Sequence, residues 1–409
     1  MSFEEEKQLE ETYVMHTFGR KPVELVSGSG MTVVDDKGNE YLDFIGGIGV
    51  ISLGHCHPAL TKAVSDQAAR LMHVSNYYYI ENRGEVAKAL SDLLNETVPE
   101  GDREPWQTFF ANSGAEANEC AIKLAILNAR RAADAAGSAH AARTVVTLEH
   151  SFHGRTLATL AATAQPVKQE MFQPLPAGFV ATPANDIAAL EALFDQMGDE
   201  ICAVMLEPVQ GECGVYPCTQ EFLEAVNRLA KQHDALIIFD EVQCGMYRCG
   251  TPYAFQQYDG IVPDIVTMAK GIAGGIPMGA CAAPASIAAA FEPGDHGSTF
   301  GGSNIAITAA ATVLETIESE GIAANVTEVG AYLREKLSQL PAVTEVRGMG
   351  LMVAADLSDS HDAPQIVLDA LGKGLLLNAT GPHTLRFLPP LVCSKADVDT
   401  LIERLAELL

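Results

Sequence analysis

The chain has 409 residues, 48% of them hydrophobic, with 35 Gly and 20 Pro, which predicts a folded protein of two or three domains and excludes a disordered chain. Its 53 acidic and 26 basic residues give a formal charge of −27. A surface of this sign repels phosphodiester backbones, so we expect no nucleic-acid partner, and an anionic substrate would need arginines inside a cleft.

The N-terminus, MSFEEEKQLEE, is acidic and lacks the apolar core of a secretion signal. No apolar run of about 18 residues, the length that a membrane span needs, occurs anywhere. The 9 cysteines are scattered without a CxxC pair, so neither a disulfide framework nor a zinc ribbon is indicated. We therefore expect no membrane association and a cytoplasmic location.

Regular structure is expected from a hairpin over Met31 to Asp43, with residues 36–39 as its turn. Short apolar runs then alternate with helical patterns, which predicts an α/β fold with a mostly parallel sheet between helices. The expected strands are Thr144 to Leu148, Ile201 to Leu206, Ala235 to Phe239, Ile265 to Met268 and Ala280 to Ala283.

The pattern changes near Ile305 to one long amphipathic helix. Strands are expected within 346–357 and 374–388, and a closing helix within 395–409. We expect residues 305–409 to form a smaller α+β domain, which residues 1–57 join, and residues 58–304 to form the large cofactor-binding domain.

Polar residues follow the predicted strands, where ligands gather in parallel sheets. His150 to Arg155 follow the first run, Glu207 the second, Asp240 the third and Lys270 the fourth. The sequence therefore predicts a site at this edge of the sheet.

Three segments suggest a chemistry, although each has a plainer explanation. Ser113-Gly114-Ala115 begins an expected helix whose amides would favour a phosphate, but serine is also an ordinary helix cap. Asp240 at the end of an apolar strand would suit a protonated ring nitrogen, or would cap a turn. Lys270, followed by Gly271, would suit a Schiff base, although most lysines are surface charges.

Taken together, these motifs resemble the class III, fold type I aminotransferases that depend on pyridoxal 5′-phosphate (PLP), from about Tyr41 to Leu391. The motifs that carry the resemblance are Asn112-Ser113-Gly114-Ala115-Glu116-Ala117-Asn118, Phe152-His153-Gly154-Arg155, Glu207-Pro208-Val209-Gln210-Gly211-Glu212, Phe239-Asp240-Glu241-Val242-Gln243 and Ala269-Lys270-Gly271. The resemblance implies a large domain with a helix-covered sheet and a smaller α+β domain.

The resemblance also implies a cofactor site. Its expected residues are Ser113, Gly114 and Ala115 at the phosphate, Phe152 and Val242 on the two ring faces, His153, Asp240 at the pyridine nitrogen, Gln243 at the 3-hydroxyl, and Lys270 as the Schiff-base lysine. Lys270 and Asp240 are the expected catalytic residues. Thr299 would reach the phosphate held by a partner subunit, which implies a homodimer with shared active sites.

For the substrates, the resemblance implies Arg386 at the α-carboxylate of 2-oxoglutarate or glutamate, and Arg155 at a second carboxylate. Glu207 would be the switch acid that pairs with Arg386 while an ω-amino donor is bound. Asn76 and Tyr77 would line the substrate pocket. Outside the motifs, each arginine is as readily explained as a surface ion pair.

Several peripheral stretches, among them Gly54-His55-Cys56-His57-Pro58 and His296-Gly297-Ser298-Thr299, resemble the acetylornithine aminotransferases. The implied reaction is ping-pong transfer of the ω-amino group of N-acetyl-L-ornithine to 2-oxoglutarate, giving N-acetyl-L-glutamate 5-semialdehyde and L-glutamate in arginine biosynthesis. The alternatives are ornithine, succinylornithine or 4-aminobutyrate aminotransferase.

A non-catalytic PLP-binding protein, the alternative from a different class, would be expected to lack Lys270 or Asp240. The adjacent His55-Cys56-His57 is expected to serve packing and turns, because neighbouring residues rarely converge on one tetrahedral metal ion. The chain departs from the family at Ser303-Asn304, and at Tyr247 and Cys249, where small residues are usual.

Overall fold

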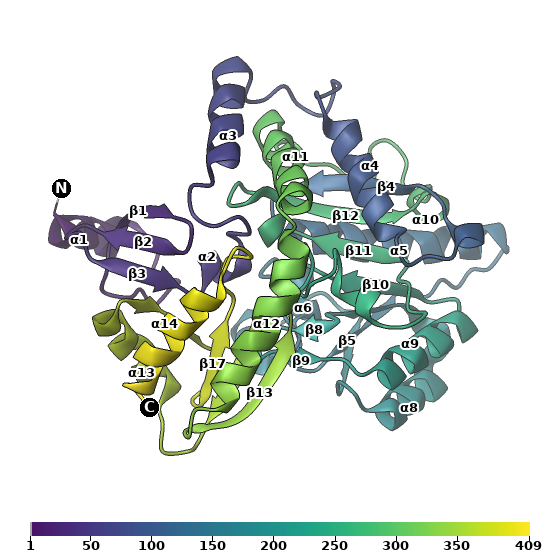
Figure 1. Ribbon diagram of the computed structural model, residues 1–409. Coiled ribbons are helices and arrows are strands. Elements are labelled where there is room, and N and C mark those ends of the chain that lie inside the picture. The colour runs from purple at the N-terminus through teal and green to yellow at the C-terminus, as the bar shows by residue number, and fades with distance from the viewer. Residues whose placement is uncertain (1) are drawn as a thin grey trace.

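A seven-stranded sheet forms the centre of the computed structural model, which describes residues 2–409 (Figure 1). In spatial order its strands are β4 (Trp106–Ala111), β12 (Gly279–Pro284), β11 (Ile265–Met268), β10 (Leu236–Asp240), β7 (Ile201–Leu206), β5 (Thr144–Leu148) and β6 (Phe179–Thr182). Only β12 runs antiparallel to its neighbours. The predicted α/β class with a mostly parallel sheet is confirmed.

Helices cover both faces of this sheet, as its side-chain alternation requires. On one face, Ala203, Met205 and Ile238 pack with buried residues of α5 (Gly114–Ala135). On the other face, Val204 and Phe239 belong to the large core cluster that includes α9 (Gln220–Gln232) and α11 (Asn304–Ser319). Every residue of β7 is buried, which explains its continuous apolar run.

The expected hairpin near the N-terminus forms from β2 (Thr32–Asp35) and β3 (Glu40–Asp43). It belongs to a second sheet of order β1-β2-β3-β15, in which β1 (Leu25–Ser29) is antiparallel to β2. β15 (Leu375–Leu376) runs parallel to β3. The N-terminal strands therefore lie beside the last third of the chain (Figure 1).

The prediction of a single long helix after Ile305 is wrong, because two helices are present. α11 ends at Ser319 and α12 (Ile322–Ser338) begins after Gly321, whose φ of +63° interrupts the helical path. α11 packs on α3 (Pro58–Arg70), whereas α12 packs on β13 (Val343–Met349) and on α14 (Lys395–Ala406). The break thus lets one predicted helix serve two parts of the molecule.

The strands expected at 346–357 and 374–388 are divided more finely than predicted. β13 (Val343–Met349) and β14 (Met352–Leu357) form an antiparallel hairpin. β17 (Thr384–Phe387) pairs with β14 and with β16 (Asn378–Ala379) to complete a four-stranded sheet. The closing helix, α14 (Lys395–Ala406), is present as expected.

The remaining elements are short or peripheral. They are α1 (Phe3–Tyr13), α2 (Gly46–Gly49), α4 (Arg83–Leu94), α6 (Leu157–Ala162), α7 (Pro166–Gln169), α8 (Ile187–Met197), β8 (Val209–Gln210), β9 (Tyr216–Pro217), α10 (Ala285–Ala288) and α13 (Ala363–Asp369). Across residues 2–409, none of the helices has the length and apolar character needed to cross a bilayer.

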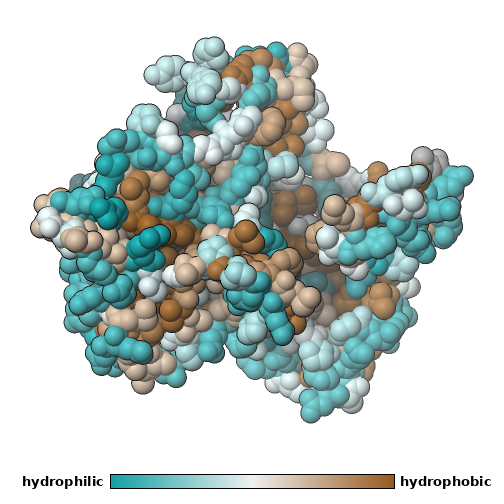
Figure 2. Space-filling model, turned by 180° about the vertical axis from the view of Figure 1, so that it is seen from behind, coloured by the Kyte–Doolittle hydropathy of each residue, from teal (hydrophilic) through white to brown (hydrophobic). Residues whose placement is uncertain are grey.

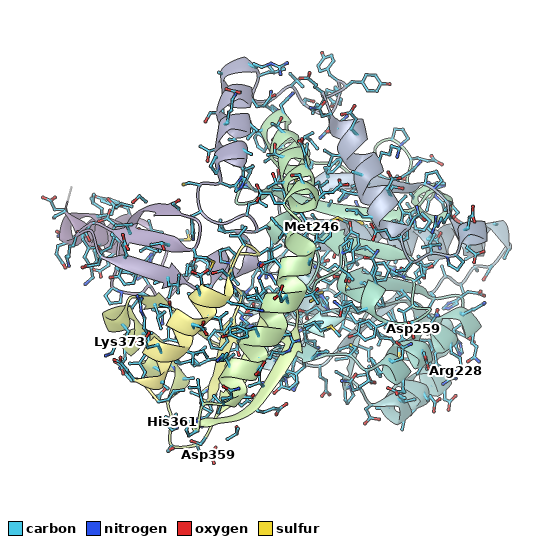
Figure 3. All side chains as sticks on the ribbon, viewed as in Figure 1. Arg228, Met246, Asp259, Asp359, His361 and Lys373 are labelled. Atoms are coloured by element: carbon cyan, nitrogen blue, oxygen red, sulfur yellow. The ribbon has the colours of Figure 1, made fainter. Side chains whose placement is uncertain are left out.

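The loop after β10, residues 241–250, runs through the middle of the molecule, where Met246 is labelled in Figure 3. Met246 is 3% exposed.

Seen from behind, the surface is hollowed near the centre, and hydrophobic residues show inside the hollow (Figure 2). Most of the surrounding surface in that view is hydrophilic.

Candidate active site

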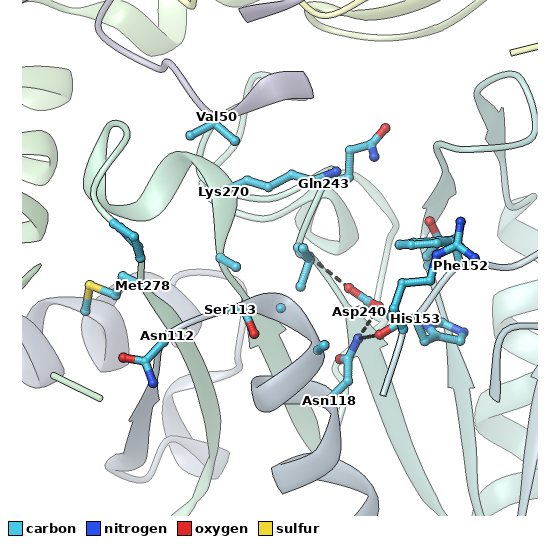
Figure 4. Close-up of a pocket in the computed structure, with 18 of the residues that line it drawn as sticks. Val50, Asn112, Ser113, Asn118, Phe152, His153, Asp240, Gln243, Lys270 and Met278 are labelled. Atoms are coloured by element: carbon cyan, nitrogen blue, oxygen red, sulfur yellow. Dashed lines mark hydrogen bonds and ion pairs between the residues drawn. The ribbon is translucent and has the colours of Figure 1, made fainter. Parts of the chain in front are cut away.

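A cavity of about 390 Å³ lies at the carboxyl ends of the central strands, as expected for a parallel sheet (Figure 4). Segments that follow five strands and the start of α5 line it, together with α2's neighbour Val50 and the loop 275–278. The lining residues are Val50, Asn112, Ser113, Gly114, Ala115, Asn118, Phe152, His153, Gly154, Arg155, Glu207, Asp240, Val242, Gln243, Ala269, Lys270, Gly275, Ile276, Pro277 and Met278.

Asp240 ends β10 and is only 2% exposed. Its Oδ2 accepts hydrogen bonds from Asn118 Nδ2 at 2.7 Å and from His153 Nδ1 at 2.8 Å, and its Oδ1 accepts one from the Val242 amide at 3.0 Å. Asn118 Oδ1 in turn accepts a 2.6 Å bond from Thr267 Oγ1. This network fixes a buried carboxylate at the cavity wall, where it can pair with a cationic ring nitrogen.

The sequence predicted a role at the cofactor for His153 but none for Asn118. His153 was expected at the cofactor, and its Nδ1 bonds Asp240, while its buried Nε2 has no partner within residues 2–409. Asn118 belongs to the recognised motif, but no role was predicted for it. Its position in the second turn of α5 becomes meaningful only when that helix packs beside β10.

Lys270 follows β11 and reaches along the cavity toward Gln243 (Figure 4). Its φ of +43° places a non-glycine residue in the left-handed region, the kind of backbone strain found at functional sites. Burial lowers the pKa of its amine to about 8, an effect that Glu212 opposes and Arg386 increases. A larger share of Lys270 is therefore neutral and nucleophilic than of a surface lysine.

The first turn of α5 forms a cup at the cavity. Ser113 caps the helix, and its hydroxyl accepts a 3.2 Å bond from the Glu116 amide while keeping its own hydrogen to donate. The amides of Gly114 and Ala115 have no acceptor within the helix and carry its positive dipole end. A Cβ at Gly114 would come within 2.7 Å of Val242 Cγ1, so this close approach requires glycine.

These side chains fit the groups of PLP. The cup offers amides and a hydroxyl to the phosphate, Asp240 offers a carboxylate to the ring nitrogen, and Lys270 offers an amine to the aldehyde. Phe152 and Val242 both line the cavity as candidates for the two ring faces. Gln243 is also present, with its Nε2 bonded to Glu212 Oε1 at 3.2 Å.

The expected pairing of Arg386 with Glu207 is wrong, because Arg386 pairs with Glu212. Arg386 Nη1 lies 2.8 Å from Glu212 Oε1 and also donates to the Gly211 carbonyl and to Gln243 Oε1. Although burial raises the pKa of Glu212, Arg386 and Lys270 lower it to about 2, so the carboxylate stays ionised.

Glu207 is fully occupied elsewhere. Its Oε2 accepts a 2.9 Å bond from the Phe152 amide and its Oε1 a 3.3 Å bond from the Gly211 amide. Burial raises the pKa of Glu207 to about 7. Glu207 therefore holds the backbone of the site together. Both acids stand in one motif, five residues apart, and only the path of the β8–β9 hairpin shows which of them reaches the arginine.

Asn76, Tyr77 and Thr299 do not line the cavity that contains Lys270. They line a second cavity of about 1040 Å³, between the segment 75–87 and the loop 294–299. A bond from Asn112 Nδ2 to Ser298 Oγ, 3.2 Å long, links the two cavities. Tyr77 and Tyr79 are 94% and 102% exposed.

Two of the departures from the family pattern, Ser303 and Tyr247, have local explanations. Ser303 caps α11, with its hydroxyl accepting from the Ala306 amide. Tyr247 has a φ of +64°, which explains why a small residue is usual there.

His55 and His57 bond to different carboxylates, Asp43 and Glu320. Within the described chain, no group of three or more His, Cys, Asp or Glu residues is placed to hold a metal ion.

Known proteins similar to this chain are aminotransferases, in agreement with the geometry of the site. The family model of class-III aminotransferases matches residues 15–409. A protein named acetylornithine aminotransferase from Caldanaerobacter subterraneus subsp. tengcongensis is 44% identical to this chain over 404 residues, which is 98% of each of the two chains.

Solved structures give the same fold. An acetylornithine aminotransferase from Elizabethkingia anophelis is 30% identical with a TM-score of 0.85, and the match covers 100% of this chain and 99% of that one. An ornithine aminotransferase from Toxoplasma gondii, described with partial occupancy of PLP at its active site, is 28% identical with a TM-score of 0.90, covering 100% and 94%.

Proposed function

The chain belongs to the class-III aminotransferases, whose cofactor is pyridoxal 5′-phosphate, and from this premise we propose the amino donor and acceptor. The proposed reaction transfers the ω-amino group of N-acetyl-L-ornithine to 2-oxoglutarate. Its products are N-acetyl-L-glutamate 5-semialdehyde and L-glutamate, as in arginine biosynthesis. Support for this donor comes from the 44% identity to a protein named acetylornithine aminotransferase.

The pair of Arg386 with Glu212 is the observation that carries the proposal. The pair neutralises the one buried arginine beside Lys270 and Gln243, so this end of the site suits a reacting carbon that bears no carboxylate. Arg155 lines the cavity without a carboxylate partner in residues 2–409. It therefore suits the carboxylate at the far end of an ω-amino donor.

PLP held in this cavity would supply an electron sink for the reacting carbon of the donor and a carrier for its amino group. Lys270 Nζ takes the proton from that carbon, and the lowered pKa of its amine suits it to act as a base. Asp240, held by Asn118 and His153, keeps the ring nitrogen protonated. Ser113, Gly114 and Ala115 hold the phosphate.

The second half-reaction needs Arg386 in its other pairing. 2-Oxoglutarate brings a carboxylate next to its carbonyl carbon, and that carboxylate can replace Glu212 on the arginine as a two-pronged partner. Lys270 then donates a proton to what was the carbonyl carbon of 2-oxoglutarate. Because the semialdehyde leaves before the keto acid binds, the two substrates use one cavity in turn.

A homodimer is also part of the proposal. Tyr77, Tyr79 and Phe300 are strongly exposed beside the second cavity, and a large exposed apolar patch is typical of an interface. Thr299, exposed in the same region, would then serve the phosphate in the partner's site. We further propose a cytoplasmic location, and a division into residues 58–304 as the large domain and residues 1–57 with 305–409 as the small one.

A donor panel tests this function. Purified holoenzyme is mixed rapidly with N-acetyl-L-ornithine, L-ornithine, N-succinyl-L-ornithine, 4-aminobutyrate or L-glutamate, and loss of the absorbance of the lysine-bound cofactor is followed. We expect the acetylated donor to react with the highest kcat/KM. A faster reaction with free ornithine or 4-aminobutyrate would replace the proposed donor, and no reaction with any of them would reject the transferase activity.

A further inference from the structure

Lys168 stands beside the cavity without a role in the reaction described above. It belongs to α7, and its Nζ lies 4.9 Å from the centroid of the Phe152 ring. Arg155 Cζ lies 5.6 Å from the same centroid. Phe152 and Arg155 both line the cavity that holds Lys270. Two cations therefore approach one aromatic ring in the cavity wall.

Neither of these cations has an ion-pair or hydrogen-bond partner for its charged group in residues 2–409. Other lysines in this acidic chain do pair, as Lys62, Lys88, Lys373 and Lys395 each contact a carboxylate. Lys168 is half-buried, and this burial lowers the pKa of its amine, with Arg155 adding to the effect and Glu212 opposing it. An anion between the two cations would stabilise both of them.

The backbone of α7 is anchored on both sides of Lys168. Gln165 Nε2 donates to the carbonyls of His150 and Ser151 at 3.2 and 2.9 Å. Gln169 Nε2 donates to the carbonyls of Leu160, Ala161 and Thr163, at 3.0, 3.1 and 2.8 Å. These bonds fix α7 against the segments on either side of Phe152, so Lys168 is positioned by the fold.

We propose that Lys168 is a second carboxylate-binding residue of the active site and that, together with Arg155, it selects substrates with a carboxylate remote from the reacting carbon. This inference rests on the proposed function and deepens it. The same two cations would receive the α-carboxylate of N-acetyl-L-ornithine in one half-reaction and the distal carboxylate of 2-oxoglutarate in the other.

The test compares two donors that differ only in the carboxylate. N-acetyl-L-ornithine carries it, and N-acetylputrescine is the same molecule without it. In Lys168→Met we expect kcat/KM for the first donor to fall about tenfold, the loss of one charge-assisted contact, with kcat at saturation nearly unchanged. For N-acetylputrescine, kcat/KM should stay within about twofold of the wild type.

Two further variants separate this effect from general damage. Lys336→Met removes the same charge from another lysine over an aromatic ring, with Nζ 5.2 Å from the Tyr332 centroid. Lys336 belongs to α12 and does not line the cavity. In Lys336→Met, kcat/KM should stay at the wild-type value for both donors. Lys168→Arg should restore most of the discrimination. Equal losses for both donors in Lys168→Met, or no loss for either, would overturn the proposal.

Binding of glutarate to the holoenzyme gives a readout that does not require turnover. Calorimetry should find its dissociation constant about tenfold weaker in Lys168→Met and close to wild type in Lys168→Arg. An unchanged constant in Lys168→Met would also contradict the proposal. If the wild type bound glutarate in this Lys168-dependent way but transferred no amino group from N-acetyl-L-ornithine, the proposed function would fail and the carboxylate site would stand.

Discussion

At the scale of single residues, the burial of Lys270 decides whether the site can begin its chemistry. Its amine is held in a strained loop beside Gln243, and burial lowers its pKa to about 8. An ordinary lysine titrates near 10.4, so most of it is charged and unreactive at neutral pH. The position of Lys270 therefore supplies a nucleophile without a neighbouring base.

We expect the reactivity of Lys270 in cofactor-free protein to rise with pH through a midpoint near 8, because the neutral amine is the reactive form. Competitive acetylation with a trace of acetic anhydride, followed by peptide mapping, measures this titration. Surface lysines in the same digest serve as the reference and should titrate near 10.4. A Lys270 midpoint in that upper range would mean that the site does not desolvate the amine.

The choice between Glu207 and Glu212 gives the second residue-scale prediction. Glu212→Gln removes the charge that neutralises Arg386, so the arginine becomes available to α-carboxylates and glutamate becomes a better amino donor. We expect the ratio of reactivity toward glutamate over N-acetyl-L-ornithine to rise about tenfold or more. Single-turnover measurements with each donor provide the ratio.

Glu207→Gln is the matched control for that experiment. It changes the same side chain five residues earlier, where the carboxylate bonds the amides of Phe152 and Gly211. We expect this variant to have lower stability or weaker cofactor retention. Its ratio of reactivity toward glutamate over N-acetyl-L-ornithine should stay close to that of the wild type. A large rise in the ratio for Glu207→Gln and none for Glu212→Gln would restore the pairing first expected from sequence.

Sequence alone located this site closely but did not resolve its contacts. The strand-end residues Asp240 and Lys270 were predictable because strand ends are marked by a change from apolar to polar side chains. The partner of Arg386 was not, since both acids share one motif and the answer depends on the path of a hairpin whose Glu212 is 174 residues away from Arg386 in sequence. Lys168 was missed for a similar reason, because its neighbours become visible only when α7 packs beside Phe152.

At the scale of elements, the β8–β9 hairpin carries Glu212 and is held by Arg347 from β13. Arg347 Nε donates to the Gly214 carbonyl at 2.7 Å, and its guanidinium lies 4.1 Å from the Tyr216 ring centroid. Two bonds to Asp356, of 2.6 and 3.0 Å, fix the arginine itself. The β13–β14 hairpin therefore positions Glu212, the acid that pairs with Arg386.

Arg347→Ala should loosen this hairpin and shift donor selectivity toward glutamate several-fold, in the same direction as Glu212→Gln but less strongly. The donor ratio in single turnover measures the shift. Arg404→Ala is a suitable control, because Arg404 also bonds a backbone carbonyl, that of Gly374, far from the hairpin. Lower stability with an unchanged ratio in Arg347→Ala would leave Arg347 a purely structural role.

Element boundaries were predictable where burial is uniform and were missed where one glycine changes the path. Strands β5, β7 and β11 begin and end at the expected residues because they are apolar runs buried on both faces. The break at Gly321 was overlooked, since the amphipathic pattern continues on both sides of it. The division of the chain into domains stays a prediction.

At the scale of the whole molecule, the second cavity and its exposed aromatic residues bear on assembly. If Thr299 serves a partner's site, Thr299→Ala should weaken PLP retention about tenfold, the loss of one hydrogen bond to a charged group. The dissociation constant can be measured by equilibrium dialysis. Sedimentation of the wild type should give twice the chain mass of 43.4 kDa.

Mixed dimers separate a role in the chain's own site from a role across the interface. When Lys270→Ala and Thr299→Ala chains are unfolded, mixed and refolded together, each hybrid should contain one site with both defects and one with neither. The intact site should then bind PLP as tightly as the wild type. No tight-binding fraction in the mixture would place Thr299 in the site of its own chain.

The proposed reaction passes the ω-nitrogen of the donor, and no other nitrogen, to the keto acid in the cavity of Lys270. The most direct measurement uses N-acetyl-L-ornithine labelled with ¹⁵N at the ω-amino group, with unlabelled 2-oxoglutarate and holoenzyme, and mass spectrometry of the glutamate formed. We expect essentially all of the new glutamate to carry ¹⁵N in the wild type, and Lys270→Ala to form almost none. Unlabelled glutamate, or labelled glutamate formed at an undiminished rate by Lys270→Ala, would contradict it.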